Sequence, residues 1–396
     1  MRVLIAPDSF SGTLTATQAA EAIAAGWREQ SPGDQLGVLP LSDGGPGFLD
    51  VLLRARGGRT VSVSVSDPLG REVPAAVLVV DDGGRPGEGG RGGGRTAYLE
   101  ASQACGLHLL AEEERDPSRT TTAGVGQLLE AALAEEPHRI VVGIGGSGTN
   151  DGGAGMLAAL GAGSRAALDR GGAALADLPD GALGELAAVR ERLAGVELVV
   201  AADVASPLLG FKGASAVFSE RKGASPEQAQ QLEAALGRFT EVAGRVLPTR
   251  TDLLTGETRR LDRQPGAGAG GGLGYGLLLL GARPVGGVDA VLEAVRFDEV
   301  LRGAQLLVTG EGSFDYDSLQ ATVVSRAAEA ALAHAVPTIV LAGQVHVGRR
   351  ETMALGITGS YAVAEHPDEV AAALADPVGT LTARARRVAG TWSPAG

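Results

Sequence analysis

Residues 139–155, R-I-V-V-G-I-G-G-S-G-T-N-D-G-G-A-G, join a short β-branched run to a loop that contains seven glycines. The run I-V-V predicts a buried strand, and the residues from Gly155 to Leu160 predict a helix. A strand, a glycine-rich loop and a helix in this order are typical of a parallel α/β sheet. In such sheets, ligands bind at the loops that follow the carboxyl ends of the strands.

The two ends of the chain repeat this pattern. Short apolar runs predict strands and amphipathic runs predict helices, with strands at 2–6, 35–41, 305–309 and 338–342, and helices at 15–27, 48–56 and 323–335. We therefore expect an α/β fold in which residues 1–66 and 287–396 together form one Rossmann- or flavodoxin-like domain with a parallel sheet.

The segment between the two ends differs. Residues 61–80 alternate as V-S-V-S-V-S and A-A-V-L-V-V around the turn D-P-L-G, which predicts an antiparallel pair and a domain change near Asp67. We expect residues 67–286 to form a second, mixed α/β domain inserted into the first.

Composition narrows the possible partners. The chain has 396 residues and a formal net charge of −13, so long-range repulsion disfavours nucleic acid and anionic membranes as partners. The single cysteine, Cys105, is expected to be a small buried residue rather than a nucleophile, and no Cys/His spacing suggests a metal site. The N-terminus lacks a signal-peptide pattern and no apolar run reaches the ~18 residues of a membrane span, so a cytoplasmic protein is expected. The expected assembly is a monomer or a homodimer.

Six loops, each expected after a strand, carry glycine or a carboxylate beside glycine: A-P-D-S-F, L-S-D-G-G, G-G-S-G-T-N-D-G-G, A-A-D-V, P-G-A-G-A-G-G-G-L-G and T-G-E-G-S-F-D. Glycine lets backbone N–H groups approach a phosphate, and carboxylates hold Mg²⁺ or accept a proton. Phosphoryl transfer needs both kinds of group. The alternative is that these glycines only make tight turns or allow close packing.

Single aspartates leave a similar choice open. Asp8 and Asp43 are equally consistent with helix caps or turns and with substrate or metal contact. Asp151 follows T-N and precedes G-G, where an Asx turn is the simpler interpretation. Asp203 ends an apolar strand and is harder to explain as a turn residue.

Taken in order, these segments resemble the bacterial glycerate kinase family that is unrelated to ribokinase-like sugar kinases. The resemblance covers almost the whole chain and rests on A-P-D-S-F, S-D-G-G, D-P-S-R-T-T-T-A-G-V-G, G-I-G-G-S-G-T-N-D-G-G-A-G-M-L, A-A-D-V-A-S-P-L-L-G, G-A-S-A-V-F-S-E-R-K-G-A, P-G-A-G-A-G-G-G-L-G and T-G-E-G-S-F-D. It implies two α/β domains with the active-site cleft between them. It also implies phosphorylation of D-glycerate to 2- or 3-phosphoglycerate with ATP and Mg²⁺ as the cofactors.

Within this resemblance we assign roles to the matching residues. The assignments are catalysis for Asp203 and Asp315, substrate binding for Asp8, Ser9, Asp43 and Gly44, phosphate or nucleotide binding for Gly145, Gly146, Ser147, Thr149, Asn150, Gly266, Gly268 and Gly270, and metal binding for Asp151 and Glu311. The expected partners are a small hydroxy acid and a nucleotide.

The chain departs from the family pattern at charged positions. Ser11 and Thr322 stand where the family usually has Lys, and Pro46 and Phe48 stand where it usually has Glu and Thr. Three interpretations follow. Lys212, Arg221 or Lys222 supplies the missing cations; or Pro46 and Phe48 form a more apolar wall for another substrate; or the protein is an inactive paralogue that binds a nucleotide or metabolite.

Overall fold

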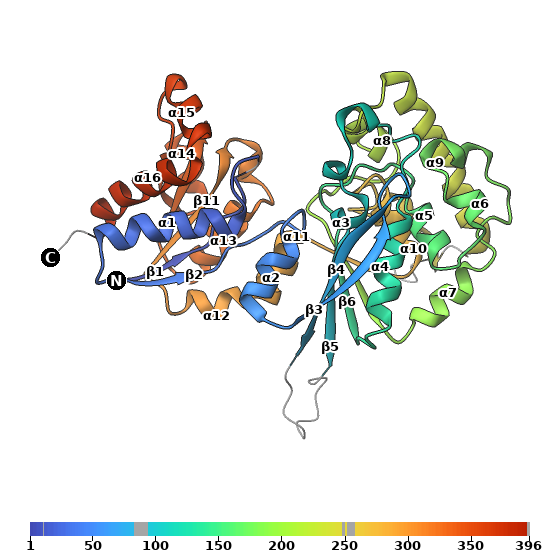
Figure 1. Ribbon diagram of the computed structural model, residues 1–396, viewed down its shortest axis with the longest axis horizontal. Helices are drawn as coiled ribbons and strands as arrows, with labels where there is room; N and C mark the ends of the chain where they lie inside the picture. Colours follow the sequence, from blue (N-terminus) through green and yellow to red (C-terminus); the bar gives the residue numbers. More distant parts are fainter. Residues whose placement is uncertain (11, 83–93, 248–249, 252–257, 394–396) are drawn as a thin grey trace. The chain divides into compact units, whose positions relative to one another are not determined.

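The computed structural model describes residues 1–10, 12–82, 94–247, 250–251 and 258–393 (Figure 1). The chain divides into two compact units. Unit 1 contains Met1–Asp43, Asp50–Arg56 and Val288–Gly396, and unit 2 contains Gly44–Leu49 and Gly57–Gly287. No helix in the described part of the chain has the length and apolar character needed to cross a bilayer.

Unit 1 is built on a five-stranded parallel sheet that uses both ends of the chain. Its order is β13-β12-β11-β1-β2. β1 pairs with β2 on one side and with β11 on the other, so the direction of winding reverses between β1 and β11. This is the strand order of flavodoxin-like folds, whose ligands bind at that reversal. The strands are β1 (Arg2–Ile5), β2 (Gln35–Val38), β11 (Leu306–Phe314), β12 (Thr338–Val345) and β13 (Ile357–Ala362).

Helices cover both faces of this sheet, because successive strand side chains point to opposite sides. On one face, Ile339 and Leu341 of β12 pack with α1 (Ala16–Gln30) and α16 (Pro377–Trp392), which lie alongside each other (Figure 1). On the other face, Val340 and Ala342 pack with α13 (Val323–Ala333). The remaining helices of unit 1 are α11 (Gly287–Ala294), α12 (Phe297–Leu301), α14 (Arg349–Ala354) and α15 (Val370–Ala375).

Glycine explains how closely α1 and α16 approach. A Cβ added at Gly26 would lie 2.1 Å from the carbonyl oxygen of Thr382, which no side chain tolerates. The Thr382 hydroxyl donates to the carbonyl of Ala22 at 3.2 Å. The C-terminal helix is therefore fixed onto the N-terminal one, and both chain ends belong to one folded body.

Unit 2 contains a six-stranded mixed sheet of order β10-β7-β6-β5-β4-β3. β5, β6, β7 and β10 are parallel, whereas β3 and β4 add an antiparallel hairpin at the edge. These strands are β3 (Arg59–Ser66), β4 (Glu72–Asp81), β5 (Arg95–Glu100), β6 (Arg139–Gly143), β7 (Glu197–Ala201) and β10 (Arg283–Val285). A separate two-stranded pair joins β8 (Arg250–Thr251) to β9 (Thr258–Arg259).

The helices of unit 2 pack around one large apolar core built from Val, Leu and Ala, with Phe239 and Tyr275 in edge-to-face contact. They are α3 (Ser102–Cys105), α4 (Ala123–Leu133), α5 (Ala154–Ala159), α6 (Arg165–Leu168), α7 (Leu186–Leu193), α8 (Ala214–Phe218), α9 (Pro226–Val246) and α10 (Leu273–Leu279).

The predicted domain boundary at residue 66 is corrected by the structure. β3 pairs with β4 along its whole length and so belongs to unit 2, which places the change at residues 56 and 57. The helix α2 (Phe48–Arg56) spans the division, because its first two residues belong to unit 2 and the rest to unit 1. The second junction lies at Gly287 and Val288, one residue from the predicted position.

Candidate active site

The carboxyl ends of β1 and β11 bring two predicted site residues together in unit 1. The N–H of Asp8 donates to the carbonyl of Gly310 at 2.8 Å, which places Asp8 beside Glu311 on β11. The N–H of Ser9 donates to Oδ1 of Asp8 at 2.6 Å and turns the chain there. Asp8, Ser9 and Glu311 line a pocket of about 380 Å³. It lies at the reversal of strand order, where ligands bind in this class of fold.

Both carboxyl groups have perturbed acidities. Burial raises the pKa of Asp8 to about 8, and the carboxylates of Asp43 and Glu311 add to the rise. Burial also raises the pKa of Glu311 to about 7, with a further contribution from Asp315. Oε1 of Glu311 is buried and accepts no hydrogen bond from any described residue. Near neutral pH this pair therefore has a strong tendency to hold a proton or a cation.

The other two predicted carboxylates of unit 1, Asp43 and Asp315, each raise the pKa of one member of this pair. Asp43 is exposed and raises the pKa of Asp8. Asp315 holds the turn after β11, since its Oδ1 accepts the N–H of Asp317 at 2.9 Å and its own N–H donates to Oγ of Ser318 at 3.1 Å. Asp315 thus has a clear structural role, and the catalytic role remains a prediction.

The far wall of the pocket is apolar. It comes from Val370, Ala373 and Leu374 on α15 and from Pro377 and Leu381 on α16. Among the described residues that line the pocket, none is a lysine, arginine or histidine. The pocket therefore has an acidic end and an apolar end, with no positive side chain between them.

The predicted phosphate loop after β6 lies in unit 2 above a buried lysine. Nζ of Lys222 donates to Oγ of Ser147 at 3.0 Å and to the carbonyl of Thr149 at 2.7 Å. Lys222 forms no ion pair with any carboxylate in the described ranges. Burial lowers the pKa of Lys222 to about 8. The nearby buried carboxylate of Asp151 acts in the opposite direction and favours the charged ammonium.

The exposed tip of this loop packs on residues 44–46. A Cβ at Gly145 would lie 2.6 Å from Cα of Gly45, and one at Gly146 would lie 2.9 Å from Cδ of Pro46. The N–H of Gly145 donates to the carbonyl of Gly44 at 3.3 Å. The N–H groups of Gly146 and Ser147 donate to no described residue and are available to an anion.

The structure does not support Asp151 as a metal ligand. Its side chain is fully buried and accepts four hydrogen bonds, from the N–H and hydroxyl of Thr122, both at 2.9 Å, and from the N–H groups of Gly153 and Gly155 at 3.0 and 3.1 Å. Asp151 therefore joins the starts of α4 and α5. The turn interpretation of this residue was the better one.

Two further loop residues are buried rather than exposed to ligand. Thr149 and Asn150 have no exposed surface, and Nδ2 of Asn150 donates to Oγ of Ser215 at 3.0 Å. A direct phosphate contact by either side chain is inconsistent with this burial. Both side chains instead lie inside the protein beneath the loop.

The loop 265–274 was expected after a parallel strand, and this was wrong. It follows the short pair β8–β9 and a 3₁₀ turn at Leu261–Arg263. Gly266 and Gly268 are buried, and a Cβ at Gly268 would lie 2.2 Å from the carbonyl oxygen of Pro207. Close packing therefore explains Gly268, and a φ of 84° explains Gly266. Gly270 is half-buried with a φ of 64°, a conformation that favours glycine.

Phe48 does not form an apolar wall. It is fully buried and packs edge-to-face on Tyr98, with ring centroids 6.2 Å apart. The start of α2 is held by Glu100, whose Oε2 accepts the N–H groups of Gly47 and Leu49 at 3.2 and 3.3 Å. Pro46 is exposed beside Gly146. Phe48 is thus a core residue of unit 2.

The remaining residues named in the sequence analysis differ in burial and in their contacts. Asp203 is half-buried directly after β7. Thr322 caps α13, because its hydroxyl accepts the N–H of Ser325. Cys105 is fully buried, as expected, and burial raises its thiol pKa to about 12. Ser11 lies outside the described residues.

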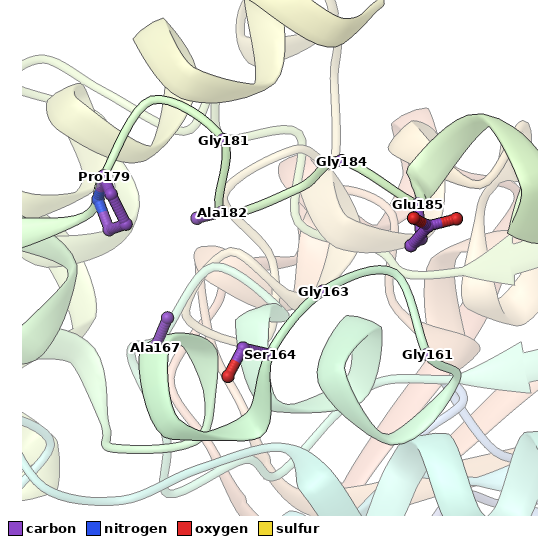
Figure 2. A pocket seen from close by; sticks show the side chains of 9 residues that line it. All are labelled: Gly161, Gly163, Ser164, Ala167, Pro179, Gly181, Ala182, Gly184 and Glu185. Atoms are coloured by element: carbon purple, nitrogen blue, oxygen red, sulfur yellow. The ribbon is translucent and has the colours of Figure 1, made fainter.

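A second cavity in unit 2 is not formed by any predicted residue. It measures about 510 Å³ and is lined mainly by glycine and alanine of the segments 161–167 and 179–185, with Ser164 and Glu185 as its polar side chains (Figure 2). It offers one carboxylate and no cation, so it lacks the groups that phosphoryl transfer requires.

Sequence reasoning named Lys222 only as one of three possible cations, and it did not single out Glu100. Glu100 ends the run T-A-Y-L-E, where a buried charge is a signal that could have been noticed, whereas Lys222 follows Glu220 and Arg221 and nothing in its sequence neighbours marks it as buried.

Comparison with known proteins agrees with this arrangement. The model of the glycerate kinase family matches residues 3–393. An uncharacterized protein of Mycobacterium bovis is 41% identical, covering 100% of this chain and 93% of that protein. A glycerate kinase of Bacillus subtilis is 38% identical, covering 92% of this chain and 90% of its own length. A crystal structure from Salmonella typhimurium LT2, assigned as a glycerate kinase 2, has a TM-score of 0.77 and 34% identity, covering 99% of this chain and 98% of its own.

A two-unit α/β fold with a flavodoxin-like sheet made from both chain ends, together with family matches over nearly the whole length, leads to one assignment: the chain is a phosphotransferase that belongs to the glycerate kinase family.

Proposed function

We propose that this protein uses ATP and Mg²⁺ to phosphorylate a hydroxyl group of D-glycerate. The observation that carries the proposal is the pair Asp8 and Glu311, two carboxyl groups with raised pKa values at the carboxyl ends of β1 and β11 in a pocket of about 380 Å³. Phosphoryl transfer needs a proton acceptor and a cation site, and carboxyl groups of this kind supply both.

In this proposal Asp8 accepts the proton of the attacking hydroxyl. A general base works best when its pKa is close to the working pH, and the pKa of Asp8 is raised to about 8. The hydroxyl oxygen forms its bond to the γ-phosphorus as the bond to the β-phosphate oxygen breaks, and the proton moves to Oδ of Asp8. Products are ADP and phosphoglycerate.

Glu311 is the proposed ligand of Mg²⁺. Its buried Oε1 has no donor among the described residues, and Mg²⁺ binds one or two carboxylates and completes its shell with water and phosphate oxygens. In the described ranges no three His, Cys, Asp or Glu side chains converge to form a cage, which this mode of binding does not require. When bound, Mg²⁺ neutralises charge that develops on the phosphate oxygens.

The anionic groups of the ligands are proposed to contact the loop after β6. The unpaired N–H groups of Gly146 and Ser147 supply donors there, with Gly145 shaping the turn. Lys222 donates hydrogen bonds to Ser147 and Thr149 and adds positive charge while almost fully buried. Preorganised donors of this kind stabilise charge on a transferring group.

Other assignments from the sequence stay proposals. Asp203 and Asp315 are alternative acceptors for the hydroxyl proton, and Ser9, Asp43 and Gly44 are proposed to contact the substrate. The phosphorylated position, the oligomeric state and the cytoplasmic location are likewise predictions.

A coupled assay for ADP release tests the proposal. D-glycerate should stimulate ADP release in the presence of Mg²⁺, and Glu311→Gln should raise the Mg²⁺ concentration required for half-maximal rate. If ATP binds but no hydroxy acid in a broad panel is phosphorylated, the protein is an inactive nucleotide-binding paralogue. Turnover with a different hydroxy acid and none with D-glycerate would support an altered substrate instead.

A further inference from the structure

We propose that the apolar end of the unit 1 pocket binds the nucleoside part of ATP. The inference rests on the proposed function in one respect, because it takes ATP to be the phosphate donor. It differs from the expectation drawn from the sequence, which placed nucleotide binding on glycine loops that belong to unit 2.

The position of the pocket supports a nucleotide. Its lining includes Asp8 after β1, Gly312 on β11, Gln344 on β12 and Ala364 after β13. These are the carboxyl ends of four parallel strands, beside the reversal between β1 and β11. Doubly wound sheets bind nucleotides in this place because the strand ends leave a crevice there.

The side chains that line the pocket favour an uncharged ligand group over an anionic one. No lysine, arginine or histidine is among the described residues that line the pocket, so its apolar end offers no cation to pair with a carboxylate such as that of glycerate. A base and a ribose carry no charge.

The walls of the pocket suit a flat ring. A Cβ at Gly343 would lie 2.4 Å from the carbonyl oxygen of Gly312, so these neighbouring strands meet without side chains. Across the pocket, α15 presents Val370 and Leu374, and Leu374 keeps 60% of its surface exposed. The amide of Gln344 offers a donor and an acceptor to the polar edge of a base.

The size of the pocket agrees with this occupant. A volume of about 380 Å³ exceeds what a three-carbon acid fills, and it lies within the range of roughly 300–1,000 Å³ that is usual for ligands the size of a nucleoside. Apolar walls with a few polar groups at one end are the usual lining of such sites.

Calorimetric titration with adenosine and with ATP–Mg²⁺ tests the inference on the full chain. The wild type should bind both. Ala373→Phe should weaken binding of both by roughly tenfold or more, because a ring at this position occupies the space of the base. Ala372→Phe, on the exposed side of the same helix, makes the same chemical change outside the pocket and should alter binding by less than about twofold.

Two further measurements keep the outcomes distinct. If Ala373→Phe does not fold, Leu374→Ala removes part of the wall without adding volume and should weaken adenosine binding about threefold or more. In the kinetic assay, Ala373→Phe should raise KM for ATP and leave KM for the hydroxy acid unchanged.

A folded wild type that binds no adenosine would overturn the inference, as would an effect of Ala373→Phe on KM for the hydroxy acid alone. Adenosine binding without any kinase activity would leave the inference standing and reject the proposed function.

Discussion

The loops after β1 and β11 in unit 1 and the loop after β6 in unit 2 contain the same kinds of residue, but their side chains are placed differently. In unit 1, Asp8 and Glu311 line an open pocket and have raised pKa values. In unit 2, Asp151 is enclosed by four hydrogen-bond donors, and Asn150 has no exposed surface.

This difference shows that glycine content alone does not indicate ligand contact. Many glycines of unit 2 are required because a Cβ would collide with backbone, as at Gly268. In the loop after β6, what remains for ligand binding is a short exposed tip at Gly146 and the buried charge of Lys222 beneath it. Most of the titratable chemistry that we have identified belongs to unit 1.

The largest effect is expected at Asp8. Asp8→Asn removes the proposed proton acceptor and should lower kcat by about 10²–10⁴-fold with little change in melting temperature. Glu299→Gln, a similar change at an exposed site on α12, is the control and should keep full activity. If the activity of Asp8→Asn stays within about twofold of the wild type, Asp8 is not the proton acceptor and the reaction does not take place in the unit 1 pocket.

A packing substitution in unit 2 should behave in the opposite way. Gly268→Ala places a Cβ 2.2 Å from the carbonyl oxygen of Pro207 and should lower the free energy of unfolding by about 1–3 kcal/mol. Gly237→Ala on α9, where no atom lies within 4 Å of the new Cβ, should be neutral or slightly stabilising. Urea unfolding measures both. A stable Gly268→Ala protein with weakened ATP binding would instead favour a ligand role for this glycine.

The pH dependence of stability distinguishes Glu311 from an ordinary surface carboxylate. Its pKa is raised from 4.5 to about 7 in the folded state, so the folded protein holds a proton that the unfolded chain has released. This contribution to stability is complete below pH 4.5 and is lost as pH rises to about 7. Glu311→Gln has no carboxyl group at this position, so its stability should not fall in this way as pH rises.

The melting temperature of Glu311→Gln relative to the wild type should therefore increase between pH 4.5 and pH 7 in the absence of divalent cations. Added Mg²⁺ should stabilise the wild type more at higher pH, because the carboxylate is then free to bind it. A constant difference between the two proteins across this range would mean that the Glu311 pKa is ordinary.

The smallest predicted effect concerns Ala321, whose φ of 56° lies in the left-handed region. Glycine adopts this conformation without the steric cost of a Cβ, so Ala321→Gly should raise the free energy of unfolding by up to about 1 kcal/mol. Ala333→Gly at the exposed end of α13 should bring no gain. Thermal unfolding of the two variants decides whether the strain exists.

Much of the fold could be predicted from the sequence because its signals are local. The α2 helix occupies the predicted residues 48–56, and the parallel sheet of unit 1 uses both chain ends as expected. Apolar periodicity and strand composition contain this information. The position of β3 was predicted less well, since its assignment depends on pairing with β4 rather than on its own residues.

The site was harder to predict, because burial and contact between distant residues decide its chemistry. Asp8 and Glu311 are 303 positions apart and meet only through the pairing of β1 with β11. Lys222 and Ser147 are 75 positions apart and touch beneath the loop. Whether a strand-end carboxylate is enclosed, as at Asp151, or open to a pocket, as at Asp8, cannot be deduced from its neighbours in sequence.

Detection of phosphoglycerate by ³¹P NMR, after incubation of the protein with ATP, Mg²⁺ and D-glycerate, tests the proposed kinase activity directly. The wild type should give a phosphate-monoester product, and Asp8→Asn should lose it at equal protein concentration and equal melting temperature. No product from folded wild type that binds ATP, or undiminished product from Asp8→Asn, would contradict this proposal.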